Sequence, residues 1–188
     1  MVIADAAVLK GRDPVDACRR AVRGGATLVQ IRMKGAPPRD VLALAVGAAG
    51  AHLGQDDPPL DALRPHVPPD FILGLSVGSQ EEADRVTAWP AGYWSVGPCF
   101  ATTTKSDAGA PLGPPGFAAL ASRAPNGIPV IGIGGITAAN AAAIVAAGAA
   151  GVAVTAAVFG ASDPEAAARA LRSACDAPPR SPPGGRGR

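Results

Sequence analysis

Short apolar runs rich in β-branched residues alternate along the chain with alanine-rich or amphipathic segments. Seven of these runs are predicted strands, over residues 2–4, 27–32, 50–54, 71–76, 93–97, 129–134 and 151–155. They are too apolar to leave one face in water, and predicted helices separate them, which is typical of a parallel sheet covered by helices. The pattern therefore predicts an α/β fold.

The first predicted helix has recognisable ends. Asp13 is its expected N-cap and Pro14 its first residue, while Gly24-Gly25 ends it. Three apolar residues repeat on one side of this helix and are expected to face the core: Val15, Cys18 and Val22. Two further helices are predicted over 137–148 and 163–174.

The predicted strands begin at intervals of roughly 21 to 25 residues, apart from one interval of 36. Such spacing indicates a repeated βα unit, and eight of these units form the (β/α)8 or TIM barrel. Because the chain has only seven, the prediction is an incomplete or distorted barrel with seven βα units. An apolar open seam in such a barrel would favour a second subunit, so a homo-oligomer is one expectation. The barrel is expected to be one domain, 1–175, followed by a disordered Pro/Gly/Arg tail, 176–188.

Composition narrows the classes of function. The net charge is +2 and aromatic residues make up 4% of the chain, which argues against nucleic acid or a membrane surface as a partner. No apolar run approaches the ~20 residues of a membrane span, and the N-terminus lacks a signal-peptide pattern, so a cytoplasmic location is expected. The three cysteines are widely scattered, which predicts small buried residues rather than a disulfide or zinc site.

Polar residues follow several strands where the carboxyl ends of a parallel sheet meet. Gln30, Arg32 and Lys34 alternate, so all three are expected on one side, where two cations and an amide suit a polyanion. The alternative is an ordinary solvated strand end.

A second group follows the strand that contains His52. Asp56 and Asp57 are candidate Mg²⁺ ligands, because this ion prefers carboxylates together with substrate phosphate oxygens. The alternative is that Asp57 caps a helix. His52 itself is a candidate base, although a lone histidine on a strand is more often a packed one.

Phosphate chemistry is indicated at two further strand ends. Gly134-Gly135 lets the backbone approach an anion closely, and the helix expected near Thr137 would direct N–H groups towards it. The long loop after 93–97 carries three hydroxyl donors and a cation, and another hydroxyl ends the strand before it. These residues are Thr102, Thr103, Thr104, Lys105 and Ser76.

Five ordered motifs between residues 2 and 174 resemble those of the thiamine-phosphate synthase family. They are Gln30-Ile-Arg-Met-Lys34, His52-Leu-Gly-Gln-Asp-Asp57, Leu73-Gly-Leu-Ser76, Val96-Gly-Pro-Cys-Phe-Ala-Thr-Thr-Thr-Lys105 and Gly132-Ile-Gly-Gly-Ile-Thr137. The resemblance implies a TIM barrel that joins a hydroxymethylpyrimidine diphosphate to a thiazole phosphate, with or without a carboxyl group on the thiazole, releasing diphosphate and forming thiamine phosphate.

The resemblance also implies roles for individual residues. Those holding the pyrimidine diphosphate would be Gln30, Arg32, Lys34, Ser76 and Lys105, of which Arg32, Lys34 and Lys105 would be catalytic. Those at the thiazole phosphate would be Thr102, Thr103, Thr104, Gly135, Thr155 and Ala156, and Asp57 would bind Mg²⁺. Departure of diphosphate leaves a cationic methylene, so positioning and charge stabilisation suffice and no general base is required.

The chain departs from the family pattern in three places. The family's Asn-Asp pair has no match, which indicates that ~20–25 residues, one βα unit, are missing between about Leu44 and Gly47. Ala156 replaces an expected serine. Gly78 stands where the related thiazole tautomerase has histidine, which disfavours that activity. The absent pair leaves one alternative function open, a non-catalytic protein that binds thiamine or thiazole phosphate.

The missing unit also predicts a rearrangement of the site. If residues 35–49 form one helix that joins its flanking strands directly, Arg32 and Asp57 lie on neighbouring strands ~4.8 Å apart. Asp57 would then be drawn towards Arg32 and Lys34, and Mg²⁺ affinity would be weak.

Overall fold

Seven parallel strands form the centre of the molecule in a computed structural model that describes residues 1–32, 47–54, 57–104 and 109–177. Their bounds are β1 Val2–Asp5, β2 Val29–Arg32, β3 Gly50–Leu53, β4 Ile72–Val77, β5 Tyr93–Val96, β6 Val130–Ile133 and β7 Gly151–Ala153. Every predicted strand is confirmed to within two residues at either end. The predicted tail beyond residue 177 lies outside the described residues.

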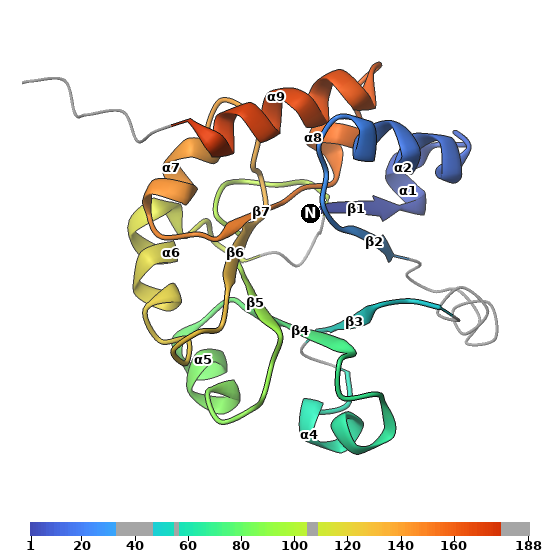
Figure 1. Cartoon of the computed structure of the whole chain (residues 1–188). Helices are drawn as coiled ribbons and strands as arrows, with labels where there is room; N and C mark the ends of the chain where they lie inside the picture. Colours follow the sequence, from blue (N-terminus) through green and yellow to red (C-terminus); the bar gives the residue numbers. More distant parts are fainter. Residues whose placement is uncertain (33–46, 55–56, 105–108, 178–188) are drawn as a thin grey trace, which may run out of the picture.

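The strands are arranged around a curved sheet whose helices lie outside it (Figure 1). One sheet has the order β3-β4-β5-β6-β7 and a second consists of β1 and β2. A single bridge between Val2 and Val154 joins them, and the Ile3 N–H donates to the Val154 carbonyl at 2.8 Å. The strands therefore follow one another as β2-β1-β7-β6-β5-β4-β3, the order of a barrel.

No strand pairing joins β2 to β3 in the part of the chain that the structure describes. Within the described part of the chain, β2 pairs only with β1, and β3 pairs only with β4. The predicted α/β, barrel-like fold is thus confirmed, and the seven described strands are compatible with the predicted incomplete barrel. Arg32 and Asp57 were predicted on adjacent strands, but no pairing joins β2 to β3 among the described residues. The helix predicted over 35–49, on which that arrangement depends, lies mostly outside the described residues.

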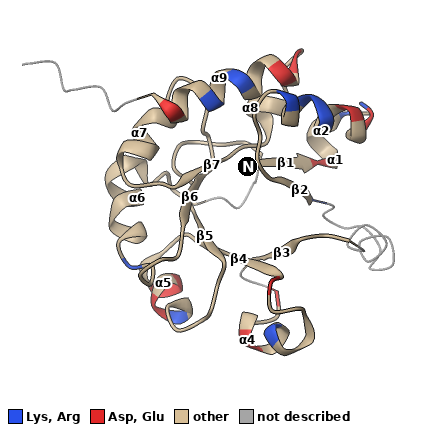
Figure 2. Cartoon of the chain, viewed as in Figure 1, with Lys and Arg blue, Asp and Glu red and all other residues tan. Residues whose placement is uncertain are grey.

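The helices follow their strands along the chain. Their bounds are α1 Ala6–Leu9, α2 Pro14–Arg23, α4 Leu60–Leu63, the 3₁₀ helix η1 Arg64–His66, α5 Gln80–Val86, α6 Gly113–Ala121, α7 Ala141–Ala146, α8 Ala156–Phe159 and α9 Pro164–Asp176. None of the described helices is long and apolar enough to cross a membrane. Figure 2 shows that Lys, Arg, Asp and Glu are concentrated on the outer helices, including α2 and α9, rather than on the strands.

The buried face of α2 differs from the prediction. Asp13 caps the helix by accepting from the Val15 N–H, as predicted. Val15 and Val22, however, are 53% and 51% exposed, whereas Ala17 and Ala21 are buried. The reason is close packing against α9: a Cβ on Gly24 would lie 2.3 Å from the Glu165 carbonyl oxygen. Small residues allow the two helices to come this close, so the buried face of α2 is formed by alanines rather than valines.

Cysteine burial is confirmed most clearly at Cys99. Its side chain is fully buried among the core residues, and burial raises the pKa of its thiol to about 11. Cys18 and Cys175 are half-buried, and burial raises the pKa of each. All three thiols are free.

Candidate active site

The described residues singled out from the sequence lie at the carboxyl ends of the strands. Gln30 lies within β2 and Arg32 ends it, Ser76 lies near the end of β4, and Asp57 follows β3. The remainder follow β5, β6 and β7: Thr102, Thr103, Thr104, Gly135, Thr155 and Ala156. Lys34, Lys105 and Asp56 lie outside the described residues.

Arg32 is held by a carboxylate on the neighbouring strand. It faces Asp5 in the β1/β2 register, and its Nη1 donates to Asp5 Oδ2. The other carboxylate oxygen of Asp5 accepts from the Ala7 N–H at 2.9 Å, which caps α1. The Asp5 side chain is 8% exposed, so this is a nearly buried anchor. Asp57 does not take this place, contrary to prediction, because Asp5 already lies opposite Arg32.

Asp5 was not singled out from the sequence. A useful signal was available, since Asp5 ends the first strand and Arg32 ends the second. Residues that end neighbouring parallel strands meet at one edge, so an acid there faces a predicted cation. Nearby, Gln30 has a buried Oε1 without a hydrogen-bond partner among the described residues.

His52 connects three strands through its two ring nitrogens. Nδ1 lies 2.9 Å from the Tyr93 hydroxyl on β5, and Nε2 lies 2.9 Å from Ser76 Oγ on β4. The rings of His52 and Tyr93 are stacked with centroids 5.6 Å apart. Burial lowers the pKa of His52 to about 4, against a smaller opposing effect of the Asp57 charge. His52 is therefore a neutral, hydrogen-bonded residue. This agrees with the interpretation of a packed histidine rather than a catalytic base.

Gly74 makes the contact between His52 and Tyr93 possible. In the strand register His52 faces Gly74, and Gly74 faces Tyr93, so the glycine separates the two rings. A Cβ on Gly74 would lie 2.1 Å from Tyr93 Cζ. The absence of a side chain lets the tyrosine ring reach across β4.

The loop after β5 is attached to the loop after β6. The Cys99 N–H donates to the Ile133 carbonyl at 2.7 Å, and the Phe100 N–H donates to the Gly134 carbonyl at 3.0 Å. Gly135 has φ +63°, and a Cβ there would lie 2.4 Å from the Ala101 carbonyl oxygen. These contacts bring the segment before Thr102 directly against Gly135.

The backbone N–H groups after β6 are arranged differently from the prediction. The helix begins only at Ala141, and the Thr137 N–H donates to Asn140 Oδ1 at 2.8 Å. Asn140 also donates from Nδ2 to the Gly135 carbonyl at 3.0 Å. The Asn140 side chain thus accepts the hydrogen bond of the Thr137 N–H. The same side chain stabilises the turn that contains Gly135.

Asp57 closes a turn rather than capping a helix. Its Oδ2 accepts from the Gly54 N–H at 2.6 Å. The next helix, α4, has Pro59 at its N-cap and no side-chain capping bond, so the capping alternative for Asp57 is wrong. Asp57 is exposed and offers hard carboxylate oxygens, the donor type that Mg²⁺ prefers.

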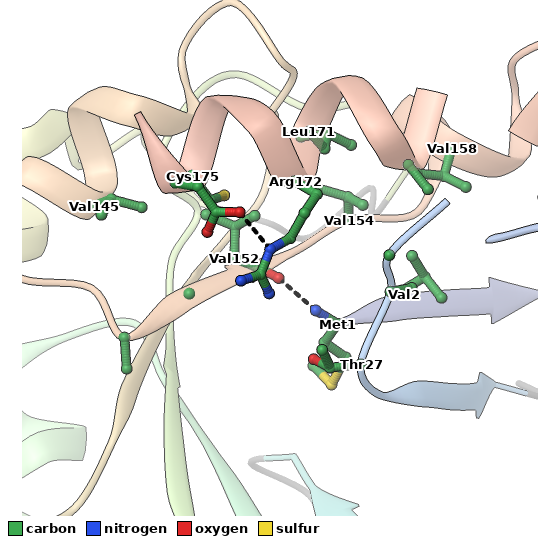
Figure 3. A pocket seen from close by; sticks show the side chains of 16 residues that line it. Met1, Val2, Thr27, Val145, Val152, Val154, Val158, Leu171, Arg172 and Cys175 are labelled. Carbon is green, nitrogen blue, oxygen red and sulfur yellow. Dashed lines mark hydrogen bonds and ion pairs between the residues drawn. The ribbon is translucent and has the colours of Figure 1, made fainter. Parts of the chain in front are cut away.

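A separate cavity lies at the opposite ends of the strands. Its volume is about 200 Å³, and it is bounded by the starts of β1 and β7 and by α9 (Figure 3). Val2, Thr27, Val152, Leu171 and Cys175 are among the residues that line it. TIM-barrel enzymes place their chemistry at the carboxyl ends, so this cavity is distinct from the candidate site.

The sequence profile of the thiamine monophosphate synthase family matches residues 39–158. The chain is 43% identical to a thiamine-phosphate synthase of Methanoculleus marisnigri, covering 91% of this chain and 92% of that protein. It is also 43% identical to one from Roseiflexus sp., covering 92% of this chain and 83% of the relative. Both alignments extend over 197 residues, more than the 188 of this chain, which agrees with a missing segment.

A comparison with solved structures leads to the same family as the sequence comparisons. A thiamine phosphate pyrophosphorylase from Pyrococcus furiosus is similar with a TM-score of 0.79 and 31% identity, covering 93% of this chain and 94% of the other. The likeness therefore extends over nearly the whole length of both chains. Sequence, profile and fold agree, and the chain belongs to the thiamine monophosphate synthase family.

Proposed function

We propose that this chain joins a hydroxymethylpyrimidine diphosphate to a thiazole phosphate at the carboxyl ends of its strands, releasing diphosphate and forming thiamine phosphate. The observation that carries the proposal is the attachment of the β5 loop to Gly134-Gly135, across the barrel from the Asp5–Arg32 pair. Two separate anion-binding regions, one glycine-rich and one cationic, suit two phosphorylated substrates.

The proposed division of roles follows the strands. Arg32, Gln30 and Ser76, with Lys34 and Lys105, bind the diphosphate; the hydroxyls of residues 102–104 and the backbone at Gly135, Thr155 and Ala156 bind the thiazole phosphate. As diphosphate departs, negative charge accumulates on it, and donors already in place stabilise that charge. Burial lowers the pKa of His52 to about 4, which makes it a weak base and is consistent with a step that needs no general base.

Mg²⁺ is part of the proposal, with Asp57 as its protein ligand. The ion is commonly held by one or two carboxylates together with substrate phosphates, so one exposed carboxylate suits a site completed by diphosphate. When bound, the ion would neutralise charge on the leaving group. Since the substrates are charged and do not cross membranes unaided, we also propose that the reaction takes place in the cytoplasm.

The direct test supplies both substrates and Mg²⁺ to the purified chain and measures diphosphate release. The proposal expects turnover in the presence of Mg²⁺. Binding of thiamine phosphate without diphosphate release, at any Mg²⁺ concentration, would instead identify the non-catalytic alternative.

A variant tests the proposed role of Lys105. Lys105→Ala removes a charge-assisted contact to the leaving group and is expected to lower turnover by about tenfold or more. Arg169→Ala, which removes a cation on the outer surface of α9, serves as the control and should retain turnover. A loss below about threefold in Lys105→Ala would contradict the role.

A further inference from the structure

We propose that Asn140 is a positioning residue for the thiazole phosphate, because its side-chain amide fixes the turn at Gly135. The inference rests on the proposed function, in which the backbone at Gly135 binds that phosphate. Asn140 need not contact the substrate itself. It immediately precedes α7, and its side chain is directed back to the turn between β6 and that helix.

The Asn140 side chain serves the turn and not the helix that follows it. Oδ1 accepts from the Thr137 N–H at 2.8 Å, and Nδ2 donates to the Gly135 carbonyl at 3.0 Å. An ordinary N-cap side chain instead accepts from an N–H in the first turn of its helix. Asn140 makes no such capping bond to α7. Both ends of its amide are therefore used to hold residues that precede it.

Two neighbouring peptide planes of the turn are held through their carbonyl groups. The Gly134 carbonyl accepts from the Phe100 N–H at 3.0 Å, and the Gly135 carbonyl accepts from Asn140. In a planar trans peptide, the C=O and the N–H point in opposite directions. Fixing the Gly134 carbonyl therefore sets the direction of the Gly135 N–H, and fixing the Gly135 carbonyl sets that of the Ile136 N–H.

These two N–H groups form the part of the turn that a ligand would use. Neither the Gly135 N–H nor the Ile136 N–H donates to another group in the described part of the chain, whereas the Thr137 N–H donates to Asn140. Gly134 and Gly135 have positive φ, +88° and +63°. Successive N–H groups in a turn form a concave site for an anion. Asn140 thus directs one of two adjacent donors and supports the turn that carries both.

The chemistry of the step indicates which kinetic constant depends on Asn140. The thiazole nitrogen bonds to the pyrimidine methylene as the methylene loses diphosphate, so the phosphate of the thiazole takes no part in bond making or breaking. Its charge stays the same as the transition state forms. Contacts to it then contribute equally to the bound state and the transition state, and their loss raises KM without lowering kcat. A contact to the departing diphosphate, as proposed for Lys105, lowers kcat instead.

The first experiment compares two substitutions that remove the Nδ2 donor. Asn140→Ala removes both side-chain bonds, whereas Asn140→Asp keeps an acceptor for the Thr137 N–H but cannot donate to the Gly135 carbonyl as a carboxylate. We expect both to raise the KM for thiazole phosphate by about tenfold, with kcat and the KM for the pyrimidine diphosphate unchanged. Since alanine carries no charge, repulsion by a new carboxylate cannot explain a loss that both variants share.

Asn126→Ala and Asn126→Asp are the matched controls. Asn126 is exposed and precedes β6, so it lies at the opposite end of the same strand from Asn140. The same chemical changes there should leave all three kinetic constants within about twofold of the native values. Urea unfolding of each variant establishes that the chains compared are folded.

The second experiment uses amide NMR and needs no turnover. Thiazole phosphate alone is added to the ¹⁵N-labelled chain, and the signals of Gly135 and Ile136 are followed. We expect both amide protons of the native chain to shift downfield, because each donates to an anion. At equal saturation the Ile136 shift should be smaller in Asn140→Asp, while Asn126→Asp should match the native chain.

Four results would overturn the proposal. The first is an unchanged KM for thiazole phosphate in Asn140→Asp, and the second is a rise in Asn140→Asp that is absent in Asn140→Ala, since charge alone would then explain it. The third is an equal rise in the KM for both substrates, which would indicate general damage to the barrel. The fourth is a native chain whose Gly135 and Ile136 signals do not respond to thiazole phosphate. A chain that shows the expected shifts but releases no diphosphate would support this inference and contradict the synthase activity.

Discussion

At the scale of single residues, the two carboxylate oxygens of Asp5 accept hydrogen bonds from two different parts of the chain. One accepts from the α1 backbone at Ala7, and the other accepts from Arg32. A carboxylate this buried is costly unless both oxygens are satisfied, so the arginine and the helix end stabilise it together. The same contacts restrict Arg32 to one orientation at the edge of the site.

Asp5→Asn tests this link. The amide keeps an acceptor for the cap but loses the charge that orients Arg32, so we expect weaker binding of the pyrimidine diphosphate and a loss of about 1–3 kcal/mol in the free energy of unfolding. Asp13→Asn is the matched control, because asparagine caps helices as well as aspartate does. Calorimetric titration and denaturant unfolding measure the two effects. Equal losses in both variants would argue against the anchoring role.

His52 should make stability depend on pH. Its pKa is lowered to about 4 in the folded chain from an ordinary 6.5, so between these values the unfolded chain binds a proton that the folded chain does not. The free energy of unfolding is therefore expected to fall as pH drops from about 6.5 to 4, by up to about 1.4 kcal/mol per unit. Urea unfolding across this range measures the slope, and His52→Phe should flatten it. An equal slope in the variant would assign the effect to other groups.

At the scale of elements, the loops after β5 and β6 behave as one unit. Two backbone hydrogen bonds join the first loop to the end of β6 at Ile133 and to Gly134 just after it, and the left-handed backbone at Gly135 brings the two loops into direct contact. The positions of the threonines in the first loop thus depend on a glycine in the second.

Gly135→Ala separates this packing effect from simple backbone strain. The added Cβ would meet the Ala101 carbonyl at 2.4 Å and displace the threonine loop, so thiazole phosphate affinity should fall at least about tenfold. Gly127→Ala is the control, because Gly127 also has a positive φ, +85°, but nothing lies within 4 Å of its added Cβ. It should cost only about 1–2 kcal/mol of stability and leave affinity intact. Matching affinities in both variants would contradict the coupling.

The sequence predicted correctly those elements that a local pattern of residues specifies. All seven strands are correct because each is a short apolar run ended by turn residues, and the Asp13 cap is a local signal. The buried face of α2 was not predictable in this way. It depends on how closely Gly24 approaches α9, which lies far along the chain. The contact of His52 with Tyr93 likewise requires the register of three strands.

For the whole molecule, the missing pairing between β2 and β3 in the described chain predicts a gradient of stability across the sheet. Strands β5 and β6 have a partner on both sides, whereas β2 and β3 have a partner on one side only within the described chain. Unpaired strand edges expose backbone groups and open at lower free energy.

Hydrogen exchange measures this gradient in a single experiment. Amides of β5 and β6 are expected to exchange at least about tenfold more slowly than those of β2 and β3, for which a difference of about 1.4 kcal/mol in opening free energy suffices. The strands with two neighbours act as the internal reference. Uniform protection across all strands would show that the seam is covered in solution, for example by a second subunit.

The bridge between Val2 and Val154 also bears on how the chain folds. It is the described strand contact that attaches β1 and β2 to the remaining strands, and it joins the first strand to a residue after the last. Contacts between distant residues require closure of a large loop and form slowly. During synthesis, β1 and β2 emerge first yet must remain detached until nearly the whole chain has been made. The neighbours β3 to β7 can pair in order as they appear, so the cationic half of the candidate site is expected to assemble last.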